Sequence, residues 1–419
     1  MTTQLPAEVA ADPAAWLTTP DGIADPFPVY RQLTQQNPIY WGHSLEAWIV
    51  TGHSLVQEVY KSHHVFSSIG NGLTRLARLP VQVRSGIPTV ELVEGMEMLS
   101  RADPPRHTQH RLMIGRPLAP RRVGSRAGWV NELCDRLAGQ MAGVPEPDLI
   151  RDYTLPIAYH AVLDLFGAPM EDLDVYREAT SAWHQFVAVT SDPVAAAERY
   201  EAALRDLRTA VESALPGIAE RGDDGIIASL VEAHARGELT RDELFVMIEI
   251  FLTAAQDNMI YTVAATVYEL LRHPDQLAEV RADPSLAAAA YEEGVRFDTP
   301  GQKSPRRVIN DCEFHGHRME AGQFLYNFKA AAVRDGTVWS HPDEFDIHRD
   351  QNEAPRGTLT FGRGIHYCIG VGVARVVGPI AVNALLRRFP RIELVPGWQA
   401  GWGYVPTFRK LTDLPLRLG

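Results

Sequence analysis

A ten-residue stretch from Phe361 to Gly370 contains the residues of this chain that are best suited to hold a metal. It reads Phe-Gly-Arg-Gly-Ile-His-Tyr-Cys-Ile-Gly and precedes an apolar run that is typical of a helix. Glycine alone tolerates positive φ without steric cost, so Gly362, Gly364 and Gly370 let the backbone turn tightly around Cys368. The N–H groups of a helix start favour the anionic form of a nearby cysteine. Cys368 is therefore predicted to be a metal-binding thiolate.

Two other interpretations use the same residues. A single cysteine is most often a small buried hydrophobic residue. The pair Gly362-x-Gly364 also suggests a dinucleotide-binding turn, but Tyr367 stands where that motif needs its third glycine. The dinucleotide interpretation is discarded for this reason.

Composition excludes several classes of protein. The chain has 419 residues, a net charge of -12 and 45% hydrophobic residues, which is ordinary for a globular protein and unfavourable for binding nucleic acid. Its three cysteines form no CxxC pair, so neither a disulfide framework nor a cysteine zinc site is expected, and a reducing cytoplasm fits best. We find no basic and apolar leader and no run of about 18 apolar residues, so no membrane span is expected.

The stretch around Cys368 resembles the cysteine-ligand loop of the cytochrome P450 family, and three further motifs stand in the order that this family requires. The resemblance covers residues 25–419 and implies a mainly α, helix-rich single domain with a small β region. It also implies haem b as the cofactor, with Cys368 as the metal ligand and Phe361, Gly362 and Gly370 beside it. Residues 1–24 are expected to be a flexible N-terminus.

The second motif supplies cations. His107 and Arg111 follow Asp103-Pro-Pro and are four residues apart, so they share one helical face, which is either a solvated surface or a site for an anion. By resemblance these two residues hold the haem propionates, because arginine binds carboxylates strongly. The family spacing implies the same role for Arg306, with Arg307 as the neighbouring alternative, and for His366.

A long apolar helix is predicted from Thr240 to about Arg272, with Thr240 and Glu243 as a capping box. It resembles the central P450 helix, in which the family usually has Ala-Gly-x-acid-Thr. The chain instead has Ala254-Ala-Gln256-Asp257-Asn258. An amide is not an acid near neutral pH. The three polar residues therefore imply either an altered proton relay, which favours peroxide as the oxidant, or a simple replacement of the threonine by Asn258.

The remaining motif is Glu293-x-x-Arg296, an i, i+3 pair that is usually an exposed surface pair. Its spacing before Cys368, together with Arg349, resembles the buried ionic network of the family. The helix that follows Cys368 contains Pro379, which is expected to kink it.

Residues that contact the substrate are harder to identify. Residues 69–100 look like a long irregular loop, which by resemblance covers the substrate cavity. The candidates for contacts with the substrate are residues on the central helices and aromatic residues of the tail, although an aromatic residue on a helix is more often part of the core: Trp183, Phe186, Ala254, Trp402 and Tyr404.

The resemblance implies an oxygenase that inserts one oxygen atom into a C–H bond of a small apolar substrate. A weaker likeness to members that demethylate methoxylated aromatics rests on Gln256-Asp257 and the aromatic tail. Separate ferredoxin and flavin reductase proteins, or hydrogen peroxide, would drive the reaction. The alternatives are a peroxide-driven peroxygenase on the same fold, a cysteine hydrolase that uses Cys368 with His366 or His341, and a haem-binding sensor or carrier without catalysis.

Overall fold

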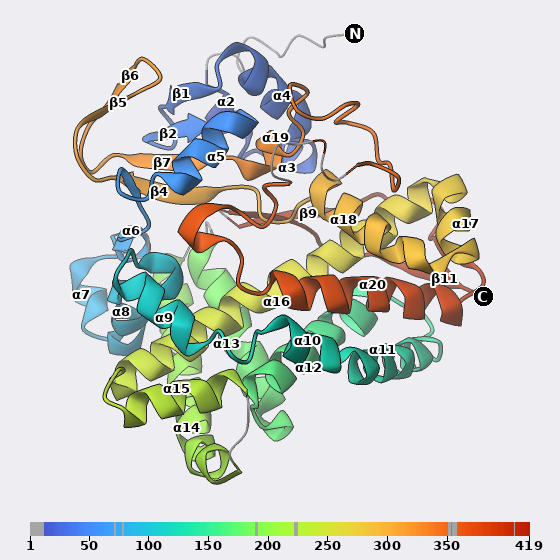
Figure 1. The fold of residues 1–419 in the computed structure, drawn as a ribbon, viewed down its shortest axis with the longest axis horizontal. Helices are drawn as coiled ribbons and strands as arrows, with labels where there is room; N and C mark the ends of the chain where they lie inside the picture. Colours follow the sequence, from blue (N-terminus) through green and yellow to red (C-terminus); the bar gives the residue numbers. More distant parts are fainter. Residues whose placement is uncertain are drawn as a thin grey trace.

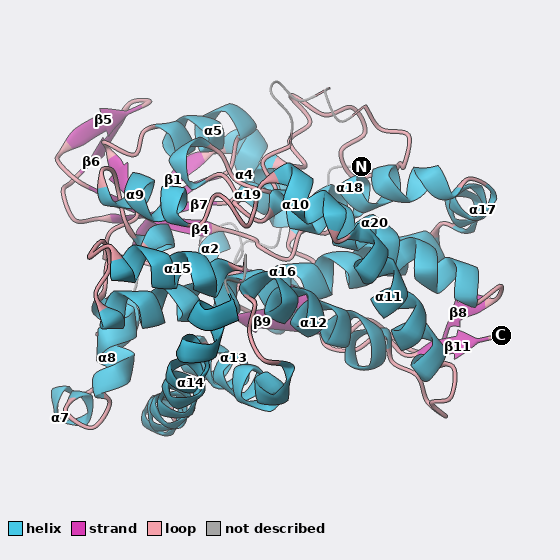
Figure 2. Ribbon diagram, turned by 60° about the horizontal axis from the view of Figure 1, so that its bottom comes forward, coloured by secondary structure: helices cyan, strands magenta, loops and turns pink. Residues whose placement is uncertain are grey.

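Helices dominate the structure, a computed structural model that describes residues 12–70, 73–77, 79–188, 192–221, 225–350, 353, 358–405 and 407–419 (Figures 1 and 2). The strands β1, β2, β4 and β7 gather at one end of the molecule, at the upper left of Figure 1. The predicted mainly α fold with a small β region is confirmed.

Helix α16 (Arg241–Arg272) crosses the centre of the molecule (Figure 1). The Thr240 side chain accepts a hydrogen bond from the Glu243 N–H, and the Glu243 carboxylate accepts one from the Thr240 N–H, so the predicted capping box is confirmed. By length and composition α16 could span a membrane, but 78% of its most apolar window is buried inside the fold. It is apolar on nearly all sides because helices surround it.

Two hydrophobic clusters pack around α16. The first cluster includes α8 (Pro88–Gly95), α12 (Leu155–Phe166), α13 (Leu173–Val187), α14 (Pro193–Arg221) and α15 (Ile226–Ala235). The second includes α11 (Ala127–Met141), part of α12, α18 (Ala287–Phe297) and α20 (Val371–Arg388). Shorter helical elements lie along the chain between these longer helices: α9 (Arg106–Met113), α10 (Pro120–Ser125), η2 (Ile150–Thr154), η3 (Met170–Asp172), α17 (Pro274–Ala282) and η4 (Pro284–Leu286).

Helix α20 contains Pro379 and is nevertheless one element from Val371 to Arg388. The residue before the proline has a packing role. A Cβ on Gly378 would lie 2.3 Å from the ring of Tyr291 on α18, which is too close for any side chain. The glycine therefore lets α18 and α20 pack tightly together.

The larger sheet has five strands in the order β1 (Ile39–Gly42), β2 (Ala47–Val50), β7 (Phe324–Asn327), β4 (Ser304–Val308) and β3 (Phe66–Ser67). Strands β2 and β7 are parallel, and the other neighbours are antiparallel. Helices α4 (Phe27–Gln36), α5 (His53–Lys61) and α19 (Lys329–Ala332) lie beside this sheet (Figure 1).

Three two-stranded sheets complete the β region. They pair β5 (Cys312–Phe314) with β6 (His317–Met319), β9 (Trp402–Val405) with β10 (Phe408–Leu411), and β8 (Ile392–Leu394) with β11 (Leu416–Leu418). The last strands of the chain, β9 to β11, belong to these small sheets.

Two expectations about irregular segments differ from the structure. Residues 12–24 contain the helices α2 (Pro13–Trp16) and α3 (Pro20–Ala24), and Ala14 and Leu17 are buried, where the sequence suggested a flexible start. The prediction of an irregular loop over residues 69–100 was wrong, because α6 (Leu73–Leu76), α7 (Val81–Arg84), α8 and η1 (Leu99–Arg101) lie in it. Prolines and glycines between these helices make each of them too short for a clear helical period.

Candidate functional site

The loop that presents Cys368 is shaped by its glycines. Gly362 and Gly364 have φ of 71° and 68°, in the left-handed region that favours glycine. A Cβ on Gly364 would lie 2.1 Å from the carbonyl oxygen of Tyr60 on α5, so no other residue fits there. The Cys368 N–H donates to the Phe361 carbonyl at 2.9 Å and closes the loop. Geometry thus favours glycine at 362 and 364, whereas Gly370 has a φ of -87° and does not need to be glycine.

The Cys368 sulfur lies just before the start of α20, whose N-cap is Gly370. Desolvation by burial raises the pKa of the Cys368 thiol, whereas the backbone N–H groups of Gly370 and Val371 and the cations of Lys329 and Arg111 act to lower it. These neighbours favour the thiolate, which is the form that binds a metal.

The predicted propionate residues meet in one cluster beside this loop. The rings of His107 and His366 lie 4.4 Å apart between centroids, and Arg111 donates to the Tyr367 carbonyl at 2.8 Å. Arg306 on β4 is buried over the Tyr60 ring. Arg307 is exposed, so the strand geometry favours Arg306 over its neighbour.

The electrostatics of this cluster call for an anion. Desolvation lowers the pKa values of His366, Arg111 and Arg306, and lowers that of His107 to about 4 with help from the neighbouring cations. Asp103 is the nearby carboxylate, and its oxygen is 4.0 Å from Nε2 of His366, which is too long for a hydrogen bond.

The residues present fit haem b. In the described part of the chain, Nε2 of His107 and Nε2 of His366 are buried and have no hydrogen-bond partner. No group of three or more His, Cys, Asp or Glu residues that could hold a metal ion occurs among the described residues. Cys368 would therefore bind a metal whose other ligands come from an organic group, and the cations beside it match the two propionates of haem.

Opposite this loop, α16 has one accessible face in the middle of its buried length. Ala254 is exposed, and Ala255 and Asn258 are partly exposed. The Asn258 amide donates back to the Ala254 carbonyl at 3.2 Å. The predicted contact residue Ala254 thus has open space beside it, and Asn258 is held by its own helix.

The predicted acid Asp257 is occupied by a partner on α13. Its carboxylate forms an ion pair with the His184 ring, and the side chains of Asp257 and His184 are 4% and 18% exposed. Gln256 is fully buried, and neither of its side-chain polar atoms has a partner in the described structure. The three polar residues of α16 therefore do not share one accessible face.

The aromatic candidates divide into different environments. Trp183 is partly buried, and its ring lies 5.2 Å from that of His184. Phe186 is a core residue that stacks on Tyr200 at 5.3 Å, so its proposed place in the cavity roof is corrected. For Phe186, the alternative that an aromatic residue on a helix belongs to the core is therefore correct.

The tail aromatic Trp402 lies outside the candidate site. It packs on Tyr268 of α16 and under the Arg409 guanidinium, and Tyr268 is ten residues, or about 15 Å of helix, beyond Asn258. The predicted substrate contact of Trp402 is therefore wrong. Tyr404 belongs to β9, but its side chain lies outside the described part of the structure.

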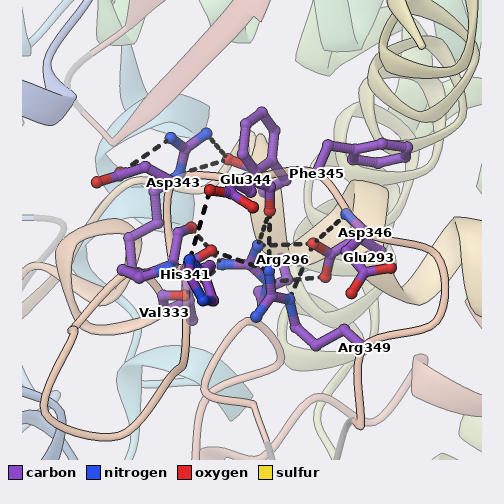
Figure 3. Close-up of polar contacts among 12 residues, drawn as sticks. Glu293, Arg296, Val333, His341, Asp343, Glu344, Phe345, Asp346 and Arg349 are labelled. Carbon is purple, nitrogen blue, oxygen red and sulfur yellow. Dashed lines mark hydrogen bonds and ion pairs between the residues drawn. The ribbon is translucent and has the colours of Figure 1, made fainter.

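The Glu293, Arg296 and Arg349 side chains form the predicted buried network, and the alternative of a surface pair is wrong (Figure 3). Arg296 binds Glu293 through two hydrogen bonds of 2.7 Å, and Arg349 donates to the same carboxylate at 3.1 Å. Both guanidinium groups also donate to backbone carbonyls between Val333 and Glu344. The network thus fixes α18 to the segment that leads toward the Cys368 loop.

The hydrolase interpretation finds no support in the geometry. His341 is 75% exposed and lies 3.4 Å from Glu344, at the edge of this network. The His366 ring faces His107, as described above. Neither histidine is engaged as a base for the Cys368 sulfur.

Sequence reasoning missed three residues of the site. Tyr60 supplies the carbonyl against Gly364 and the ring under Arg306, His184 pairs with Asp257, and Lys329 acts on Cys368. Each lies far along the chain from its partner and belongs to no motif. Only a tertiary structure could have connected them.

Comparisons with known proteins agree with this geometry. The sequence model described as "Cytochrome P450" matches residues 196–397. Over 409 residues the chain is 31% identical to the cytochrome P450 monooxygenase PikC of Streptomyces venezuelae, covering 95% of this chain and 92% of that protein. It is 30% identical over 404 residues to the vitamin D(3) 25-hydroxylase of Pseudonocardia autotrophica, covering 94% of each. The crystal structure of CalO2 has a TM-score of 0.85 and 27% identity, and the match covers 96% of this chain and 98% of that one.

Proposed function

The chain belongs to the cytochrome P450 family of haem-containing monooxygenases, and we propose that it inserts one oxygen atom into a C–H bond of a small apolar molecule, a methoxylated aromatic being the first candidate. The family uses haem b. When bound, haem with a thiolate ligand supplies the oxygen-activating chemistry, because the sulfur donates electron density that favours cleavage of the O–O bond. The observation that carries the proposal is the Cys368 loop, together with the accessible face of α16. Beside the loop lie Arg111, Arg306 and two histidines whose buried Nε2 atoms lack a hydrogen-bond partner in the described part of the chain.

The chain's own residues have distinct roles in this proposal. Cys368 is the metal ligand, and the N–H groups of Gly370 and Val371 stabilise its charge. His107, Arg111, Arg306 and His366 bind the propionates and so orient the cofactor. Phe361 and Gly362 shape the loop beneath it. For an O-demethylation, hydroxylation of the methyl carbon would release the phenol and formaldehyde.

Electrons are proposed to come from a separate ferredoxin and flavin reductase. An iron–sulfur cluster is usually held by four cysteines, whereas this chain has three and one of them serves the haem. A cytoplasmic location and the absence of nucleic acid and membrane partners remain proposals that rest on composition and charge.

The first experiment compares Cys368→Ala with the matched variant Cys312→Ala, a partly buried cysteine on β5. Loss of the haem-thiolate absorption spectrum and of oxidation only in the Cys368 variant supports the proposal. A colourless wild-type protein, or a Cys368 variant as active as its parent, would overturn it. Titration of the wild type with methoxy-aromatics, fatty acids and terpenes, followed by the spin-state change, then selects the substrate class.

A second candidate is a peroxide-driven peroxygenase on the same fold. It is favoured by α16, where Asp257 is paired with His184 and the Asn258 amide is bound to the Ala254 carbonyl. The acid is thus shared with a histidine, and an amide stands where the family has an alcohol, so proton delivery to dioxygen would differ from that of an acid with a free alcohol beside it. Product formation with hydrogen peroxide is compared with that driven by reductase and dioxygen, and negligible product with peroxide removes this candidate.

A further inference from the structure

Lys329 is an interior cation at the candidate site whose role so far is its electrostatic effect on Cys368. It begins α19 directly after β7, and its Nζ donates to the Thr360 carbonyl at 3.0 Å, on the segment that leads to Cys368. A Cβ placed on Gly301 would lie 2.6 Å from this Nζ and 3.7 Å from Oδ1 of Asn258. The ammonium group therefore lies between the Cys368 segment and the accessible face of α16.

Lys329 has no carboxylate partner among the described residues. Desolvation lowers its pKa to about 8, and Cys368 acts in the opposite direction. An ammonium group has three donors, and in the described part of the chain the Thr360 carbonyl is its one hydrogen-bond acceptor. An interior ammonium group with donors left over and no carboxylate beside it is costly, so the site favours a further anion.

A ligand can reach this charge. Lys329 keeps accessible surface although protein atoms have displaced most of its water, and Ala254 and Asn258 are accessible as well. Gly301 contributes by having no side chain, since a Cβ there would displace the ammonium group. The lack of a side chain at Gly301 therefore lets the ammonium group lie near the accessible side chain of Asn258.

This charge is separate from the cluster that fits the propionates. Burial is the chief cause of the lowered pKa values of His107 and His366, and the charged groups that act on them include Arg111, Arg306 and Asp103. Lys329, like Arg111, acts on Cys368, but its ammonium group lies beside Gly301 and near Asn258. The site therefore has cations in two places, and the propionates account for one of them.

We propose that Lys329 binds the carboxylate of the substrate, so that the enzyme selects small apolar molecules that carry one carboxylate over their neutral analogues. The inference rests on the proposed oxygenase function and narrows its substrate class. An ion pair of this kind also orients the substrate, because the charged end is fixed beside Gly301 and the apolar end is left for oxidation.

The test uses the haem-loaded full chain and pairs of probes that differ only in charge. The probes are 4-methoxybenzoate with 4-methoxybenzamide, and octanoate with octanamide. Binding is measured by the haem difference spectrum and, independently, by equilibrium dialysis. The wild type is expected to bind at least one acid about tenfold more tightly than its amide. Lys329→Met should weaken acid binding by at least about tenfold and change amide binding by less than about threefold.

Two further variants test whether the effect belongs to the Lys329 ammonium group. Gly301→Ala places a Cβ against the flexible end of Lys329 and should weaken acid binding while the protein still folds. Lys303→Met is the matched control, because Lys303 is also a buried lysine but lies over the rings of Tyr326 and Phe328. It should leave the preference for the acid unchanged.

The outcomes separate the two levels of the proposal. A wild type without haem contradicts the oxygenase function itself. A haem-loaded wild type that binds every acid and its amide equally overturns the role of Lys329 and leaves the oxygenase function intact. If Lys329→Met lowers the haem content per protein while the remaining holoprotein still prefers the acid, Lys329 serves the cofactor and the inference is wrong.

Discussion

Replacing Glu249 by glutamine should remove a pH dependence that this carboxyl group imposes on stability. Glu249 lies on α16 and is 1% exposed. One of its oxygens accepts a hydrogen bond from Tyr200 at 2.7 Å, and the other has no partner among the described residues. Desolvation raises its pKa to about 7, against the opposing effects of Arg101 and of the Tyr200 hydrogen bond.

The sign and size of the effect follow from linkage. The folded protein keeps the Glu249 proton up to about pH 7, whereas the unfolded chain releases it near 4.5. Between these values the folded state binds more protons, so the stability that the protonated group provides is lost as the pH rises. The span of about 2.5 pH units, at about 1.4 kcal/mol each, gives at most about 3.5 kcal/mol.

Glutamine keeps an acceptor for Tyr200 and has no charge to desolvate. The free energy of unfolding of Glu249→Gln should therefore exceed that of the wild type by about 1 to 3 kcal/mol at pH 8.5, and the two should agree within about 1 kcal/mol at pH 4.5. Urea unfolding followed by circular dichroism across this range measures the difference. Glu393→Gln, on the exposed part of β8, is the control and should show no trend.

A difference between Glu249→Gln and wild type that stays constant from pH 4.5 to 8.5 would refute the reasoning, as would a wild type that gains relative stability with rising pH. Either result would mean that the carboxylate is ionised in the fold and compensated by Arg101. The result bears on the central helix, because the Tyr200 hydrogen bond to Glu249 joins α14 to α16.

Two further predictions concern the buried ionic network and the distal acid. Arg349→Gln should lower the free energy of unfolding by about 3 kcal/mol, because Glu293 loses a buried partner, whereas Arg199→Gln in an exposed pair should cost less than about 1 kcal/mol in the same urea assay. Asp257→Asn should lower product formation with reductase and dioxygen by at least about tenfold and change peroxide-driven formation by less than about threefold. An equal loss in both assays would show that the pair with His184 holds the fold together instead of handling protons.

Local signals account for the parts of the site that could be predicted. The Cys368 loop is a contiguous motif whose glycines are needed for its own backbone. The capping box of α16 lies within four residues, and Glu293 and Arg296 are one helical turn apart. Such features depend on near neighbours in the chain, so the sequence contains them almost completely.

Features that depend on distant packing could not be predicted. Aromatic content suggested a substrate role for Trp402, but the pairing of β9 with β10 places it against Arg409 and Tyr268. The ion pair between His184 and Asp257 needs the packing of α13 on α16, which neither segment encodes by itself. Single residues without a motif acquire a role only from the elements that surround them.

The position of Lys329 depends on how strands β4 and β7 pair. Ser304 on β4 lies opposite Asn327 on β7, and extending this antiparallel register by two residues brings Gln302 opposite Lys329. The Ala330 N–H donates to the Gln302 carbonyl at 3.1 Å, which confirms that the two segments stay together beyond the strands. A slip of one residue would turn the lysine to the other face of the sheet. The register that buries Arg306 thus also sets Lys329 beside Gly301, so the roles proposed for these two residues depend on the same pair of strands.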